Sequence, residues 1–491
     1  MKMQSASSRR GASKCWLVLA ILLALAATAW ARPGGGDSFS GGGGHGGGGG
    51  GGGAELVFEL IYWTLRLIIY YPAIGLPLLA IVIIAICVSA YRQHQNKDWD
   101  SGPPVELHRA ITAATKPDPN FSQPVFEDFA FRLFATAHRA RESAQKLAAA
   151  VGPYMNEATR DQLTKREPVG EPVRQVVVGA LRVIDVTSAE TGATINVEYE
   201  SNIATDKHTF YTVESWRFAR APGVTSKPPS PSRIFTCPNC GAPWDSQSTG
   251  SQQCASCQQI VDNGRFDWVV NAISVESSDE RPPTLTTDVP ERGTDLPTYR
   301  QNAVDTRWSE MVADDPALSR EAFDKRVELI YATLNHGWSA NHLEPARGLV
   351  SDGLYDYLQY WVDAYKAQGL RNQLTNMRIT RMQLAKIARD TYYDAVTVRI
   401  WGTGLDFVVQ SATGKLVRGS KHRERPYSEY WTFIRSAARK GPPRTDAACS
   451  NCGAPLHISQ AGTCDHCGAH VTSGEFDWVL SKIEQDDTYR G

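Results

Sequence analysis

The chain has 491 residues, of which 42% are hydrophobic and 21% charged, and this balance excludes wholesale disorder. Its 51 lysines and arginines nearly balance 52 aspartates and glutamates, and the resulting net charge of -1 argues against a main role in nucleic-acid binding. The length allows about two to four domains. Because 15 of the 41 glycines lie within residues 34–53, different segments of the chain must differ strongly in composition.

Residues 1–31 have the features of a secretory signal peptide. Basic residues precede an apolar run at residues 15–31, which ends in an Ala-x-Ala cleavage pattern. An uncleaved signal anchor is the alternative. Residues 32–54 are rich in glycine and are expected to form a flexible segment, since they cannot bury enough apolar surface to fold.

Residues 55–91 are predicted to contain a transmembrane helix. Residues 67–90 carry no charge, and this length is sufficient to span a bilayer. Arg92 and Lys97 follow the span, so the positive-inside rule places the rest of the chain in the cytoplasm. We therefore expect a single-pass protein of the inner membrane, with the lipid bilayer as one partner.

The remaining sequence contains a tandem repeat. A helix start with an aspartate, a serine and a phenylalanine occurs twice, as Asp118, Ser122 and Phe126 and as Asp315, Ser319 and Phe323. Each serine is expected to cap the N-terminus of a helix. Both copies also share a strand motif, which comprises Glu214, Trp216, Phe218 and Arg220 in the first and Glu429, Trp431, Phe433 and Arg435 in the second.

The four residues of each strand motif lie on one face of a strand, because side chains alternate along it. We expect this face to be part of the core. The alternative is a pocket with an acid and a base at its ends.

Eight cysteines form four Cys-x-x-Cys pairs, two pairs in each copy of the repeat. The predicted metal ligands are Cys237, Cys240, Cys254 and Cys257 in the first set and Cys449, Cys452, Cys464 and Cys467 in the second. Four thiolates at these spacings suit a tetrahedral zinc ion without an open position, so we expect two structural zinc ions and no catalytic metal. Neither module has an excess of basic residues, and no nucleic-acid partner is expected.

Both cysteine modules end in the same tripeptide, Phe-Asp-Trp. We predict that Phe266 and Trp268, like Phe476 and Trp478, leave the module and are buried against the preceding domain, because zinc ligation does not require them. The aspartate between them is expected to face away or to cap a helical turn.

The glycine-rich segment, the proline-containing span at residues 71–77, the helix start and the strand motif together resemble bacterial membrane proteins with a Tim44-like domain. Residues 351–355 and 365–372 look typical of this family. Its name comes from a subunit of the mitochondrial import motor. The resemblance implies an α+β fold with two tandem cone-shaped domains, similar to nuclear transport factor two, in which helices pack on a curved antiparallel sheet.

On this basis the expected units are a first Tim44-like domain at 105–225, a zinc ribbon with its tail at 233–272, a linker at 273–299, a second Tim44-like domain at 300–437 and a second ribbon at 445–485. The expected function is tethering or scaffolding of a protein partner at the membrane, with a link to protein transport. A small-molecule binder or hydrolase that uses the cone pocket is the alternative. No catalytic motif is evident, so we do not expect an enzyme.

Overall fold

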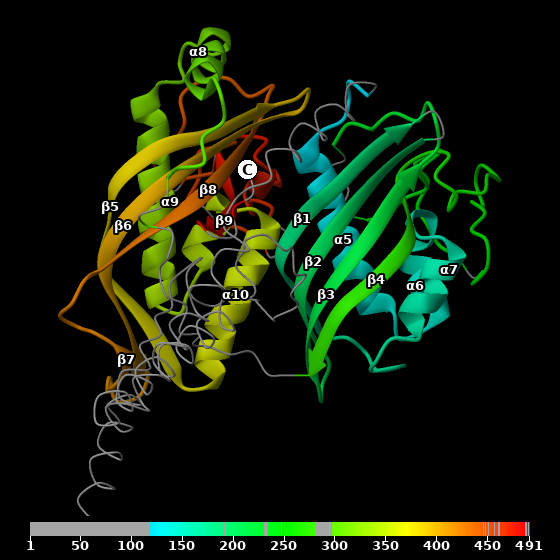
Figure 1. Cartoon of the computed structure of the whole chain (residues 1–491), viewed down its shortest axis with the longest axis horizontal. Helices are drawn as coiled ribbons and strands as arrows, with labels where there is room; N and C mark the ends of the chain where they lie inside the picture. Colours follow the sequence, from blue (N-terminus) through cyan, green and yellow to red (C-terminus); the bar gives the residue numbers. More distant parts are fainter. Residues whose placement is uncertain are drawn as a thin grey trace, which may run out of the picture. The chain divides into compact units, whose positions relative to one another are not determined.

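The computed structural model describes residues 118–189, 192–229, 234–246, 248–280, 294, 297–444, 446, 448–449, 451–455, 457–459, 462–486, 489 and 491. The predicted signal, glycine-rich segment and transmembrane region lie outside these residues. None of the helices formed by the described residues is both long enough and apolar enough to cross a membrane. The fold is mixed α+β with two antiparallel sheets (Figure 1).

The first half begins with helices that cover its sheet. These are α5 (Gln123–Ala140), α6 (Ala144–Val151), the 3-10 turn η1 (Gly152–Tyr154) and α7 (Glu157–Thr164). Helix α5 begins as predicted, since the Ser122 side chain accepts a hydrogen bond from the Val125 amide. Its apolar residues recur at helical spacing, and Phe126, Leu133 and Phe134 are buried in the core against the sheet.

The first sheet has the order β1-β2-β3-β4, and all neighbours are antiparallel. Its strands are β1 (Gln175–Ala189), β2 (Gly192–Ala204), β3 (Thr209–Arg220) and β4 (Val269–Glu280). Because β3 and β4 are adjacent in the sheet, the first cysteine module is an insertion between two paired strands. The expectation that the module follows a completed domain was wrong.

Strand β4 also corrects the expected linker boundary at residue 273. Val270 and Ile273 are buried in the core and hold this segment beside β3, although its second half is rich in serine and acidic residues. Such polar residues are common on an edge strand, where they resemble a linker in composition.

The second half has the same arrangement with longer elements. Its helices are α8 (Val304–Asp314), α9 (Arg320–Ser339), the 3-10 segment η2 (Glu344–Leu349) and α10 (Asp352–Ala367). Ser319 caps α9 as predicted, because its side chain accepts from the Ala322 amide. Phe323, Val327 and Ile330 of α9 are fully buried in the second core.

The second sheet has the order β5-β6-β8-β9, with β7 paired to β6. Its strands are β5 (Leu370–Arg389), β6 (Tyr393–Gln410), β7 (Leu416–Gly419), β8 (Arg425–Ser436) and β9 (Val479–Gln485). The second cysteine module, which includes the 3-10 turn η3 (Val471–Ser473), lies between the paired strands β8 and β9. The last strand, which was expected to be part of the ribbon, therefore belongs to the sheet.

The two halves share a further contact between a helix start and the last strand. The residue two positions before α7, Met155, forms a parallel bridge with Val270, and Val350 forms the same bridge with Leu480 before α10. Helix α10 is thus the lengthened counterpart of α7, with 16 residues in place of 8.

Candidate metal centres

The four sulfur atoms of each cysteine module converge. Within each set all four lie within 4.8 Å of one another. The sulfur–sulfur distances include 3.8 Å for Cys237–Cys257 and Cys240–Cys254, 3.9 Å for Cys449–Cys467 and 4.0 Å for Cys452–Cys464. All eight cysteines are free. A tetrahedron with metal–sulfur bonds of about 2.3 Å has edges of about 3.8 Å, so both clusters fit a four-thiolate metal ion.

Each Cys-x-x-Cys turn has the same backbone geometry. In the first turn the Gly241 amide donates to the Cys237 carbonyl at 2.9 Å, and the Cys237 amide donates to the Ala242 carbonyl at 2.9 Å. The residue after the second cysteine has a positive φ in all four turns, and it is Gly241 (74°), Gln258 (58°), Gly453 (75°) and Gly468 (71°). Glycine is favoured at three of them because it adopts this conformation without strain. Gln258 is the exception.

Two asparagines support the thiolates from outside the ligand set. Asn451 Nδ2 donates to Cys467 Sγ at 3.5 Å, and together with the Ala469 amide it lowers the pKa of Cys467 to about 7, the amide having the larger effect. A hydrogen bond from the Asn239 side chain lowers the pKa of Cys257 to about 6. The thiolate is the form that binds metal, so these contacts favour binding. Sequence reasoning missed both asparagines, although the shared Cys-x-Asn-Cys pattern was a signal.

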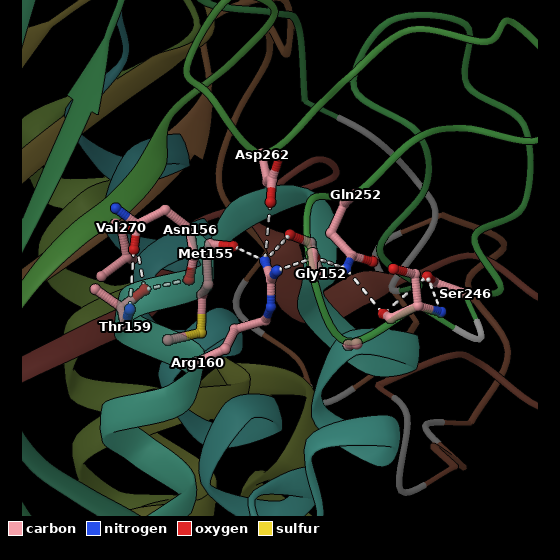
Figure 2. A network of polar contacts seen from close by, with 12 residues as sticks. Gly152, Met155, Asn156, Thr159, Arg160, Ser246, Gln252, Asp262 and Val270 are labelled. Carbon is pink, nitrogen blue, oxygen red and sulfur yellow. Dashed lines mark hydrogen bonds and ion pairs between the residues drawn. The ribbon is translucent and has the colours of Figure 1, made fainter.

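A buried arginine attaches the first cysteine module to the helices of its domain (Figure 2). Arg160 of α7 pairs with Asp262 of the module at 3.2 Å, and both side chains are buried. The same guanidinium donates to the carbonyl oxygens of Gly250 at 2.6 Å, Gly152 at 3.1 Å and Met155. The buried positive charge is therefore compensated by groups from both the module and the domain.

The second module is attached at the equivalent helix start but by different residues. Asp352, the first residue of α10, accepts from Thr472 Oγ1 at 3.0 Å and lies 3.2 Å from His470 Nε2. Arg347 pairs with the same carboxylate. In both halves the module thus rests against the helix that precedes the sheet.

Three sequence motifs meet in one cluster in each half. In the first, Arg220 Nη2 of the strand motif lies 2.7 Å from Asp118 Oδ2 of the helix start, and its guanidinium lies 4.3 Å from the ring centre of Trp268. The second half repeats this arrangement, with 3.1 Å between Arg435 and Asp315 and 4.7 Å between Arg435 and Trp478. These repeated residues hold the helix start, the third strand and the tail together.

The shared strand face is part of the core, as expected. Trp216 Nε1 donates to Glu214 Oε2 at 2.9 Å, Trp431 Nε1 donates to Glu429 Oε2 at 2.9 Å, and all four side chains are buried. The glutamates are therefore partners of the neighbouring indoles within the core.

Glu214 has additional partners in the first half. His138 Nε2 lies 3.3 Å from Glu214 Oε1, and Arg166 pairs with the same oxygen. Burial alone would raise the pKa of Glu214, but His138 and Arg166 hold it well below its usual range. Burial lowers the pKa of His138 to about 4, so its imidazole is neutral at neutral pH.

The Phe-Asp-Trp tail connects the module to the domain. Trp268 and Trp478 are buried in the two domain cores, as predicted. Phe266 and Phe476 instead pack against the cysteine modules, so that part of the prediction was wrong. The prediction assumed an extended tail, whereas the chain bends here before β4 and β9 and turns the two aromatic residues to different sides.

The aspartate of the tail was expected to face away or to cap a helical turn, and this was wrong for Asp477. Its Oδ1 accepts the Trp478 amide at 2.7 Å, and its Oδ2 accepts the Arg444 amide at 2.8 Å. Because Arg444 begins the module and Asp477 ends it, this buried carboxylate fastens the two ends together. Asp267 likewise accepts the Trp268 amide, at 2.8 Å.

Comparison with known proteins identifies the second half. The model of the family described as "Tim44-like domain" matches residues 305–444. No curated protein matches the chain. The matched region begins in α8 and ends after β8. Strand β9, which pairs with β8, therefore lies beyond the end of the matched region. Residues 305–444 are thus a Tim44-like domain, and the strand that follows the second cysteine module extends its sheet.

Proposed function

We propose that the chain is a membrane-anchored scaffold that tethers a protein partner at the cytoplasmic face of the inner membrane, in a process related to protein transport. The Tim44-like domain at residues 305–444 is the observation that carries this proposal. The uncharged stretch at residues 67–90 supports the membrane anchor. The basic residues that follow it support an orientation with the C-terminal part in the cytoplasm.

We also assign the first half to a second, divergent Tim44-like domain. Both halves have a sheet whose last strand follows an inserted cysteine module. Both contain the cluster of aspartate, arginine and tryptophan, with Arg220 and Arg435 at its centre. Two unrelated domains would have no reason to repeat this cluster, so we attribute it to duplication.

Zinc is the metal that we assign to both cysteine clusters. Its structural sites are formed by four thiolates in a tetrahedron, and the sulfur spacing found here fits that geometry. When bound, the ion would cross-link the two turns of a module that has a small hydrophobic core of its own. Arg160 and Asp352 then hold each module against its domain.

We propose a role without catalysis. The acid and the base at the ends of the strand motif are Glu214 and Arg220 in the first half and Glu429 and Arg435 in the second. All four side chains are buried, and each is held by another group of the fold. In the part of the chain that the structure describes, no observation favours the alternative of a small-molecule binder or hydrolase.

Photo-crosslinking in intact membranes tests the proposal. A crosslinking amino acid placed at exposed positions of α8 or α10 should capture a specific protein from membranes that contain the full chain. A variant that lacks residues 55–91 is the control and should lose both membrane attachment and the crosslink. Extraction of the full chain by alkaline carbonate, or crosslinks only to abundant soluble proteins, would contradict the proposal.

A further inference from the structure

A short hairpin at the surface of the second cysteine module carries two histidines that the four-thiolate cluster does not use. Ile458 forms an antiparallel bridge with Cys464. Beside this bridge, the Asp465 amide donates to the His457 carbonyl at 2.9 Å. His466 follows directly, inside the Cys-x-x-Cys turn. Both histidines are exposed, and neither belongs to the converging group of ligand atoms that the cysteines form.

The register of this hairpin places His457 and Asp465 on its outer face. Because Ile458 lies opposite Cys464, the next pair along the hairpin is His457 with Asp465. Ile458 and Cys464 belong to the small hydrophobic core of the module. Side chains alternate between the two faces of a strand, so His457 and Asp465 lie side by side on the face that points to solvent. The hairpin thus sets an imidazole beside a carboxylate.

The two imidazole rings lie at a distance that suits a shared metal ion. Their centres are 6.1 Å apart, and their planes are tilted by 57°. Two imidazoles bound to one zinc ion through bonds of about 2.0–2.1 Å have ring centres about 5–6 Å apart. A small rotation of the exposed side chains of His457 and His466 therefore brings a nitrogen of each ring to one ion. The carboxylate of Asp465 can supply a third ligand.

The charge of the second module favours a cation at this place. Residues 444–480 contain one arginine and no lysine against four carboxylates, which is a formal excess of three negative charges. The arginine, Arg444, already pairs with Asp446 at 2.9 Å. Among the residues that the structure describes, no basic side chain forms a salt bridge with Asp465. A positive ion at the hairpin would therefore meet an unneutralised carboxylate in an acidic module.

The first cysteine module provides an internal comparison, because it has the same four thiolates but neither histidine. Ser256 stands at the place of His466, inside the second Cys-x-x-Cys turn. Asp245 stands at the place of His457, five residues after the first turn. The sulfur atoms converge in both modules, so the assembly of a cluster does not require the histidines. Their presence in the second module needs a separate explanation.

We propose that His457 and His466, with Asp465 as a third ligand, bind a divalent transition-metal ion at the surface of the second module. Imidazole is a ligand for zinc, nickel and copper, whereas magnesium prefers oxygen ligands alone. Because water fills the remaining positions, this site should bind zinc more weakly than a cluster of four thiolates. A chelator wash should therefore remove this ion and leave the two cluster ions. The inference is independent of the proposed scaffold function.

Protection of the histidines from diethyl pyrocarbonate tests the proposal. The full chain is loaded with zinc and washed with a weak chelator. Zinc is then added back, and the modification of each histidine is measured by mass spectrometry. His457 and His466 should become protected together in the micromolar range of zinc, whereas His342, an exposed histidine beside Glu344, should react as before. Magnesium in place of zinc should protect none of them.

Variants distinguish a shared ion from two independent contacts. His466→Ser introduces the residue that the first module has at Ser256, and it should weaken the protection of His457 by zinc at least about tenfold, since the loss of an outer-shell partner alone costs about 10–100-fold. His342→Gln is the matched control and should leave this protection unchanged. Washed protein should retain two zinc ions in both variants. The proposal would be overturned by unprotected histidines in millimolar zinc, by full protection of His457 in the His466→Ser variant, or by the loss of a cluster ion from that variant.

Discussion

The guanidinium of Arg220 lies 4.3 Å from the centre of the Trp268 ring, and the two residues come from opposite ends of an insertion. Arg220 ends β3, whereas Trp268 directly precedes β4. Asp118 neutralises the arginine from the other side. This stacking therefore fixes the place where the chain leaves the sheet relative to the place where it returns, and Arg435 and Trp478 do the same in the second half.

The first prediction concerns the Phe-Asp-Trp tail. Trp478→Ala should destabilise the second domain by about 3–5 kcal/mol, since it removes a fully buried aromatic side chain that also contacts Phe323. Its metal content should not change. Phe476→Ala is the matched variant, and it should loosen the cysteine module more than the domain core because Phe476 packs on the module. Thermal unfolding and metal analysis distinguish the two, and equal effects of both variants on the domain would contradict this division.

The second prediction concerns the metal content of the cysteine clusters. The purified full chain should contain two zinc ions, one for each cluster, and Cys240→Ser should remove about one of them. Asn451→Ala should lower the metal affinity of the second module by about 10–100-fold, because an outer-shell hydrogen bond to Cys467 is lost. Competition with a chelator measures this. A metal content near zero in reduced protein would refute the assignment.

The third prediction concerns the buried pair of Arg160 and Asp262 shown in Figure 2. Asp262→Asn should cost about 3–5 kcal/mol, because Arg160 would remain buried without its counter-charge. Asp206→Asn breaks a bidentate pair with Arg174 at the surface and should change the stability far less, because water screens both charges. Hydrogen exchange in the first module reports its release from α7. If both variants had the same small effect, the pair would not hold the module in place.

The fourth prediction concerns pH. The unfolded chain binds a proton on His138 near pH 6.5, whereas burial lowers the pKa in the folded state to about 4, so stability should fall as the pH drops between these values. The depressed pKa of Glu214 acts in the same direction, since its stabilising effect is lost below its ordinary pKa of 4.5. Hydrogen exchange of β3 at several pH values measures the trend.

A substitution taken from the chain itself provides the control for pH. Asn335 lies 16 residues after the cap of α9, as His138 does after the cap of α5. His138→Asn should therefore make stability nearly independent of pH above pH 4.5, while the loss of stability below pH 4.5 remains. An unchanged profile in this variant would show that another group titrates.

The features that the sequence predicted are local ones. The serine caps at Ser122 and Ser319 and the Cys-x-x-Cys turns depend on residues within a few positions of each other, so their spacing was enough. Trp268 and Trp478 were placed correctly because large aromatic residues are usually buried. The predicted span lies outside the described residues and stays a prediction.

The features that were missed depend on distant pairing. Strands β4 and β9 were assigned to a linker and a ribbon because their second halves are mostly polar and only the adjacent strand defines them. Arg160 and Asp262 are separated by 102 residues, and neither stands out in sequence. Phe266 was placed wrongly because the chain bends between it and Trp268. The sequence shows only that the two residues are two positions apart, and this spacing does not reveal a bend.

The position of the cysteine modules has a consequence for synthesis. As the chain leaves the ribosome, the strands up to β3 in the first sheet and up to β8 in the second appear first, then the four thiolates, and only then the strand that completes the sheet. Until β4 or β9 emerges, β3 or β8 has an open edge that can pair with another chain. The metal ion that we assign to the module would shorten the flexible loop that must close before this edge is covered, and it would lower the entropy lost on closure. A cell short of that metal would therefore accumulate nascent chains with uncovered edges, and aggregation during synthesis would be the first sign of metal deficiency.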